Sequence, residues 1–441
     1  MHVLSRSAVA SAADRRARIA TRLKPMPIRT GRFLPALLGA LLVLAGCASV
    51  GSPLPMSKAD ETSSEELSFA VRTLEANGEF EMRSSREIAR RLKSRLGDRP
   101  LSILALSSGG ANGAFGAGAL AGDAPAGTQP QYTVVTGVSA GALVAPFAFL
   151  GSSWDPEMTR IFTTGVTDHL LRHRGLGAFF GPSLYSGAPL RRLIERYANS
   201  AMIAAIATQA AKGRLLLVAT TDLSTGEPVI WDLGSIAFHG GKNAKPLIQS
   251  ILLASASVPG MFPPVVVRFQ SRGKMRAETH VDGGVTLPFF IAPSPQDLPQ
   301  PSPAGARPTL VRVIVDGQLR NLPSPTHANA LSVFRRSLAA GLSHETRAQL
   351  EATAQALRER GIALDYAAIP ASYPLGGTFN FSLDTQRSLF EYAAHCAAAG
   401  RLWIGARANA APEVSALLSP IGSARCPAND SFFERLAALR N

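Results

Sequence analysis

A serine lies between two glycines in the segment "GVSAG", residues 137–141, after the apolar run "YTVVT" and before an apolar, helix-like stretch over 140–150. A strand, a sharp turn and a helix are the setting in which a serine hydroxyl can stand clear of a sheet as a nucleophile. The glycines permit the turn without Cβ clashes, and the N-terminus of the following helix favours developing negative charge. The pattern predicts that Ser139 is a nucleophile for acyl transfer, although G-x-S-x-G also occurs by chance.

A glycine-rich segment, "LSSGGANGAFGAG" at 106–118, follows another apolar run. It has no lysine, which a Walker A loop requires, and its glycine spacing does not fit the dinucleotide-binding fingerprint. Backbone N–H groups free of bulky side chains can instead stabilise the oxyanion of an acyl-transfer intermediate. Because the carboxyl ends of parallel strands share one edge of a sheet, this loop and Ser139 should meet there. The alternative is a glycine turn that serves close packing.

Two aspartates precede a glycine at the end of an apolar run: Asp282 in "VDGGV" and Asp316 in "VIVDGQL". In an extended segment His280 and Asp282 would point to the same face, so a Ser-His-Asp triad is conceivable. The alternative for His280 is a partly exposed side chain at the rim of a site. His169 and His173 are interpreted as surface residues, and the sequence shows no metal-ligand spacing.

Five segments follow one another along the chain in this order: "SSGGANGAFGAG", "GVSAG", "ATTDLSTGEPVIW", "ASASVPGMFPPV" and "VDGGV". Together they resemble the patatin-like phospholipase family over roughly residues 101–320. The resemblance implies a catalytic dyad of Ser139 and Asp282, with Asp282 preferred to Asp316 and no catalytic histidine. It also implies no cofactor and no metal, and an oxyanion hole built from the backbone of Gly109, Gly110, Ala111 and Ala140.

Three positions depart from the family pattern. The family often has a third glycine and an arginine or lysine where this chain has Ser108 and Asn112. It also often has an asparagine six residues after the aspartate, where Pro288 stands. These departures leave open a noncatalytic lipoprotein that binds lipids or partners.

The elements expected to position these residues alternate along the chain. Strands are predicted at 101–107, 132–137, 215–233 and 309–317, and helices at 140–150, 188–201 and 245–257. Alternating strands and helices indicate an α/β fold with a mainly parallel sheet flanked by helices, as in the patatin-like α/β/α arrangement. Two N-terminal helices are predicted at 65–76 and 85–97. The C-terminal portion is expected to be mostly helical, at 329–361 and at 383–400 with Asp384 as cap, plus a strand at 362–370.

Four regions follow from this pattern. Residues 1–46 are predicted to be a lipoprotein signal peptide, 47–98 a tether with N-terminal helices, and 99–320 the catalytic domain. Residues 321–441 are expected to be a helical extension packed on that domain. A proline-rich segment at 293–308 is interpreted as a surface loop.

The net charge of +14 first suggests nucleic acid, but residues 1–46 hold eight Lys/Arg against one Asp, and no nucleic-acid-binding module appears. "RTGRFLPALLGALLVLAGC" has the charged and short apolar regions of a signal peptide, starting from Met1 or Met26. Its end, "LAGC", resembles the bacterial lipobox and implies that Cys47 is lipidated. With Ala48 next, the resemblance implies the outer membrane. The alternative is a buried helix with an incidental cysteine.

The two remaining cysteines, Cys396 and Cys426, could pair in an oxidising periplasm or remain buried thiols. Met261, Phe262, Phe289 and Phe290 could line an acyl pocket or belong to the core. The resemblance therefore implies a lipid-anchored serine hydrolase that cleaves fatty-acyl esters of phospholipids or lysophospholipids, so that membrane lipids are both substrate and anchor. A general carboxylesterase or acyltransferase with the same dyad is the alternative enzyme.

Overall fold

The structure is a computed structural model that describes residues 70–97, 99, 101–123, 131–175, 181–299, 309–319, 325–406 and 426. The predicted signal peptide and residues 47–69 of the predicted tether region, Cys47 included, lie outside these residues. Among the described helices, none is both long enough and apolar enough to span a bilayer.

The strands of the described residues form one mixed sheet of eleven. They are β1 (Ala70–Leu74), β2 (Phe80–Ser84), β3 (Ser102–Leu106), β4 (Val134–Val138), β5 (Leu215–Asp222), β6 (Pro228–Asp232), β7 (Val265–Ser271), β8 (Lys274–Asp282), β9 (Leu310–Val315), β10 (Leu364–Ala368) and β11 (Ile404–Ala406). Their order is β11-β10-β9-β3-β4-β5-β6-β1-β2, with β8 paired to β5 and β7. The five strands from β10 to β5 in this order are parallel, so their carboxyl ends share one edge.

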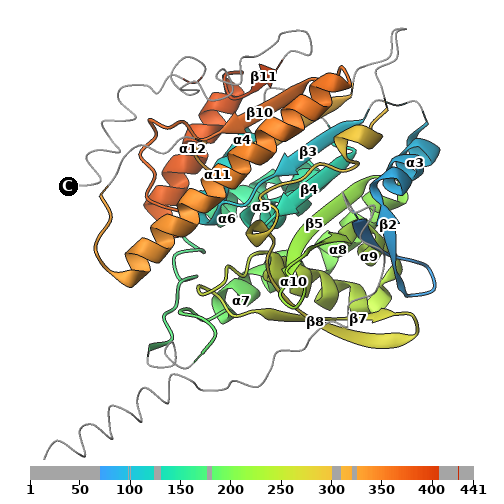
Figure 1. The fold of residues 1–441 in the computed structure, drawn as a ribbon, viewed down its shortest axis with the longest axis horizontal. Helices are drawn as coiled ribbons and strands as arrows, with labels where there is room; N and C mark the ends of the chain where they lie inside the picture. Colours follow the sequence, from blue (N-terminus) through green and yellow to red (C-terminus); the bar gives the residue numbers. More distant parts are fainter. Residues whose placement is uncertain are drawn as a thin grey trace, which may run out of the picture. The chain divides into compact units, whose positions relative to one another are not determined.

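Helices cover both faces of the sheet (Figure 1). One face packs on α3 (Ser85–Leu96) and α11 (Ala330–Glu359) through a core that includes Ile88, Leu92 and Leu357. The other face packs on α4 (Gly113–Asp123), α5 (Ala140–Leu150), α6 (Asp155–Thr163), α7 (Ala188–Tyr197), α8 (Ser200–Ala211), α9 (Leu233–His239), α10 (Ala244–Ser255) and α12 (Leu383–Ala398). The predicted fold, a mainly parallel sheet flanked by helices with a helical C-terminal part, is confirmed.

The glycine-rich segment continues into α4, where its glycines serve close packing. Gly118 and Gly122 face α12, and a Cβ atom on either would collide with the carbonyl oxygen of Phe390 or Ala394. Because neither glycine has a side chain, the backbones of α4 and α12 can lie in direct contact. The packing alternative considered for this segment therefore holds for its C-terminal half.

The helix predicted at 65–76 is wrong for its described residues, since 70–74 form β1. Val71 and Thr73 are fully buried while Arg72 between them is not, which is the alternation of a strand. β1 pairs with β2 on one side and β6 on the other, and this pairing overrides the local helical spacing. The hairpin of β7 and the first part of β8 was not predicted, and α12 begins after Ser382 rather than being capped by Asp384.

The C-terminal part of the described chain adds two strands, β10 and β11, to the same sheet as the upstream strands. Cys396 in α12 forms a disulfide with Cys426, with their Cα atoms 5.5 Å apart. The structure therefore selects the paired alternative for these two cysteines.

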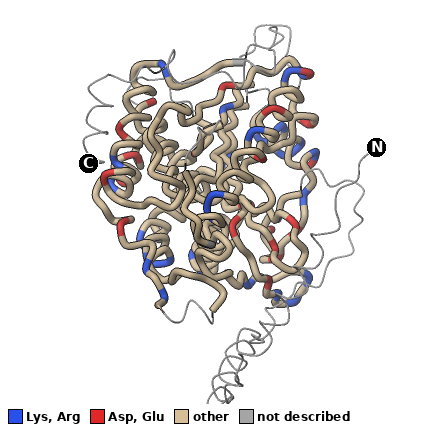
Figure 2. The backbone as a smooth tube through the Cα atoms, turned by 60° about the vertical axis from the view of Figure 1, so that its left-hand side comes forward, with Lys and Arg blue, Asp and Glu red and all other residues tan. Residues whose placement is uncertain are grey.

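Basic and acidic residues are interspersed along the described chain (Figure 2).

Candidate active site

Ser139 occupies a strained turn between β4 and α5. Its φ of 55° and ψ of −120° lie outside the regions that side-chain-bearing residues prefer, at a cost of about 1–3 kcal/mol. A Cβ atom on Gly137 would lie 2.6 Å from the Gly141 carbonyl oxygen, and one on Gly141 would lie 2.5 Å from that of Leu106. Both glycines are therefore required for the turn, as the sequence pattern predicted.

The position of Asp282 follows from how β5 is paired. Along one edge of β5, residues 215–219 pair with β4 and residues 220–222 pair with the end of β8. β4 therefore stops at Val138, and β8 takes over the edge with Asp282 opposite Thr220. Ser255 bridges the break, because its hydroxyl accepts the Ser139 N–H at 3.0 Å and donates to the Ala219 carbonyl at 2.7 Å.

The structure thereby brings Ser139 and Asp282 together. The Ser139 hydroxyl donates to Asp282 Oδ2 at 2.5 Å, and the second carboxylate oxygen accepts the Gly284 N–H at 2.7 Å. Both side chains are buried. Burial raises the pKa of Asp282 to about 7, even though the hydrogen bonds from Ser139 and Gly284 favour the ionised form. A carboxylate with this pKa is suited to accept a proton near neutral pH.

The loop from Ser107 to Asn112 lies beside this pair, because a Cβ atom on Gly284, whose N–H bonds Asp282, would meet that of Ser108 at 2.9 Å. Gly110 has a φ of +59°, which favours glycine. Within the described residues, the amides of three predicted oxyanion donors have no acceptor: Gly109, Gly110 and Ala140. Their N–H groups are available to a ligand.

The fourth predicted donor is engaged by a backbone carbonyl in this structure. The Ala111 N–H donates to the Thr378 carbonyl at 2.8 Å and is therefore already engaged. The Ser108 N–H is likewise engaged, with the Pro288 carbonyl at 2.8 Å. Two of the positions that depart from the family pattern thus meet through their backbones, in a contact that needs no particular side chain.

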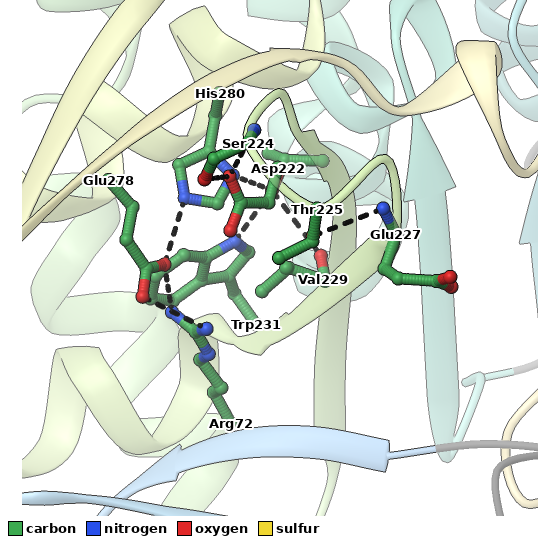
Figure 3. Close-up of polar contacts among 10 residues, drawn as sticks. Arg72, Asp222, Ser224, Thr225, Glu227, Val229, Trp231, Glu278 and His280 are labelled. Atoms are coloured by element: carbon green, nitrogen blue, oxygen red, sulfur yellow. Dashed lines mark hydrogen bonds and ion pairs between the residues drawn. The ribbon is translucent and has the colours of Figure 1, made fainter. Parts of the chain in front are cut away.

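His280 does not contact Ser139. Its side chain is fully buried, so it is not a partly exposed rim residue either. The ring nitrogens bond Thr220 Oγ1 at 3.0 Å and Glu278 Oε2 at 3.2 Å, and Glu278 pairs with Arg72 at 2.6 Å (Figure 3). His280 and Asp282 both lie in β8, opposite Asp222 and Thr220, but the His280 ring is engaged by Thr220 and Glu278, whereas Asp282 bonds Ser139 and Gly284.

Asp316 lies beneath the glycine-rich loop, away from the serine hydroxyl. Its Oδ1 accepts the Gly116 N–H at 2.8 Å, and burial raises its pKa well above the ordinary value. A Cβ atom on Gly109 would collide with Asp316. Asp316 therefore packs against the loop rather than serving as a base for Ser139.

An apolar cavity opens beside Ala140 and Gly110. Its wall includes Leu143, Phe147, Ile161, Leu170, Ile194 and Met202. Two polar side chains, Thr167 and Gln386, hydrogen-bond each other in this wall. The four residues proposed from sequence as a pocket lining are buried in the core instead: Met261, Phe262, Phe289 and Phe290. No cluster that could hold a metal occurs among the described residues.

Residues 104–293 match the family model of patatin-like phospholipases. This chain contains a patatin-like phospholipase domain. The match supports a lipid-hydrolysing esterase. Among solved structures, the crystal structure of VipD from Legionella pneumophila is similar, with a TM-score of 0.29 and 10% identity, covering 76% of this chain and 72% of that chain. No match was found among curated proteins.

The match to the patatin-like family model ends before several residues that contact the glycine-rich loop. Asp316, Thr378 and Gln386 all contact the glycine-rich loop and all lie beyond residue 293. The sequence does not reveal this role for any of them, because a backbone carbonyl such as that of Thr378 leaves no signature in residue type. Ser255 lies within the recognised segment "ASASVPG", but that resemblance assigned it no function.

Because Asp282 must be ionised to accept a proton, we expect kcat/KM to fall as pH drops below about 7. The decline should be about tenfold per pH unit on the acid limb. A soluble short-chain ester assayed from pH 5 to 9, with the fold monitored by circular dichroism, measures it. Asp316→Asn should keep the same limb, since Asp316 also has a raised pKa but does not contact Ser139. An activity that stays flat to pH 5 would contradict the assignment of Asp282 as base.

Proposed function

We propose that this protein is a membrane-anchored serine acyl hydrolase that cleaves fatty-acyl esters of phospholipids or lysophospholipids. The observation that carries the proposal is the 2.5 Å hydrogen bond from Ser139 to Asp282, next to unengaged backbone amides. A nucleophile in direct contact with its base is the arrangement that acyl transfer requires.

The reaction proceeds in two halves. The Ser139 oxygen attacks the ester carbonyl carbon, and its proton passes to Asp282. The carbonyl oxygen becomes an oxyanion, which the amides of Gly109, Gly110 and Ala140 stabilise together with the N-terminus of α5. When the intermediate collapses, the leaving alcohol takes the proton from Asp282. Water then attacks the acyl-enzyme, with Asp282 as base, and Ser139 regains its proton as the fatty acid leaves.

The apolar cavity supports a fatty-acyl substrate. It begins at Ala140, next to the nucleophile, and its wall is almost entirely hydrocarbon. Each methylene group buried there contributes about 0.8 kcal/mol. Long-chain esters should therefore bind more tightly than acetyl esters, which favours a lipase over a general carboxylesterase. An acyltransferase would differ only in the second half of the reaction, where an alcohol instead of water attacks the acyl-enzyme.

Two observations support anchoring at the periplasmic face of the outer membrane. The sequence "LAGC" ends in Cys47, which lies outside the described residues, and Ala48 follows it. The disulfide between Cys396 and Cys426 fits an oxidising compartment. A diacylated and N-acylated cysteine has enough acyl chains for stable attachment.

The dyad is tested by Ser139→Ala, Asp282→Asn and the double variant, assayed on a panel of phospholipids and lysophospholipids. Each single variant should lose about 10³-fold or more in kcat, and the double should be no worse, because the two groups act as a unit. A fluorophosphonate probe should label the wild type and fail to label Ser139→Ala.

Asp316→Asn is the matched control, because it alters a buried carboxyl that does not contact Ser139. It should still be labelled and active. Labelling that persists in Ser139→Ala would refute the nucleophile, and a folded wild type inactive on every lipid would refute the proposed substrate class.

The anchor is tested with Cys47→Ala in the full chain expressed in a bacterium. The variant should accumulate as a larger precursor, whereas the wild type should carry an acylated Cys47 at its mature N-terminus and fractionate with outer membranes. Mass spectrometry of the wild type that finds an unmodified N-terminus at another residue would disprove lipidation.

A further inference from the structure

Ser107 follows β3 and begins the glycine-rich loop, and its side chain is fully buried. Its hydroxyl accepts the backbone N–H of Asp316 at 2.9 Å. The same hydroxyl donates to the carbonyl oxygen of Ser108 at 2.8 Å. Ser107 therefore links the end of β9 to the first peptide group of the loop.

The bond to the Ser108 carbonyl has a consequence for Gly109, because both belong to one peptide group. A trans peptide is planar, and its C=O and N–H point in opposite directions. Holding the Ser108 carbonyl against Ser107 therefore aims the Gly109 N–H away from Ser107. Glycine restricts the backbone less than any other residue, so this peptide would rotate more freely without such a bond.

The other peptide groups of the loop are held by backbone partners. The Ser108 N–H bonds the Pro288 carbonyl, and the Ala111 N–H bonds the Thr378 carbonyl. The Gly109 carbonyl accepts the Asn112 N–H at 3.2 Å, which fixes the peptide that contains the Gly110 N–H. The Ser108–Gly109 peptide differs from these because a side chain, that of Ser107, holds it.

We propose that Ser107 is a positioning residue that aims the Gly109 amide at the oxyanion. The proposal rests on the function proposed above, in which Gly109 is an oxyanion donor. Removing the hydroxyl leaves Ser139, Asp282 and the apolar cavity in place. The loss should therefore fall on the chemical step rather than on substrate binding.

The test compares Ser107→Ala with Ser235→Ala. Ser235 is a matched control, because its buried hydroxyl also accepts a backbone N–H, from Leu74, and donates to a backbone carbonyl, that of Asp232, each at 2.9 Å. Both variants lose the same kind of bridge and should show similar falls in Tm. Ser107→Ala alone should lower kcat, by between about tenfold and 10²-fold with little change in KM, somewhat less than removal of a whole oxyanion donor.

A second readout separates positioning from general damage to the fold. A trifluoromethyl ketone that forms a tetrahedral adduct should lose affinity for Ser107→Ala by the same factor as kcat/KM, whereas a fatty acid should bind unchanged. Should Ser107→Ala fail to fold, Ser107→Cys decides, since its thiol is nearly the same size but a weak donor. Its kcat should also fall.

A kcat within about twofold of wild type in a folded Ser107 variant, or an equal loss in Ser235→Ala, would overturn the positioning role, because an oxyanion donor is worth far more. Either result leaves the proposed function standing. A wild type that hydrolyses no lipid ester would overturn both.

Discussion

One edge of β5 is occupied first by β4 and then by β8, and the direct contact between Ser139 and Asp282 depends on that exchange. β4 must leave the sheet after Val138, which forces the strained turn at Ser139. β8 must reach the same point from the opposite direction, which places Asp282 there. Gly283 packs against the Ala219 carbonyl, so that the turn after β8 can follow β5 closely. Two residues 143 positions apart thereby meet at one strand edge.

This arrangement destabilises the ionised form of Asp282, because it buries the carboxylate. Among the described residues Asp282 has two hydrogen-bond donors and no basic partner, and burial raises its pKa to about 7. The ionised carboxylate that the reaction needs is therefore the form that burial disfavours. In the described residues the Ser139 hydroxyl bonds Asp282 and no histidine, which is the arrangement that the proposed direct proton transfer requires. The three unengaged amides, those of Gly109, Gly110 and Ala140, and the N-terminus of α5 are groups that can stabilise an oxyanion.

The sequence was most informative where function constrains residue type. Gly137, Gly141 and Ser139 are explained by the turn they form, and the parallel sheet followed from its alternating strands and helices. Backbone partners could not be foreseen: the Thr378 carbonyl that engages Ala111 comes from a distant loop, and any residue could supply it. The strand β1 was missed because pairing between β2 and β6 outweighs local periodicity. The rim position expected for His280 was wrong because its ring is buried and bonds Thr220 and Glu278, contacts that the sequence does not reveal.

A crystal structure of the enzyme after reaction with a fluorophosphonate tests the account most directly, because the phosphoryl group mimics the tetrahedral intermediate. Phosphorus should be bonded to Ser139 Oγ, and one phosphoryl oxygen should lie about 2.7–3.1 Å from the amide nitrogens of Gly109 and Gly110. The Ala111 amide should remain bonded to Thr378. Phosphorus on another residue, or a phosphoryl oxygen that meets none of the loop amides, would contradict the account.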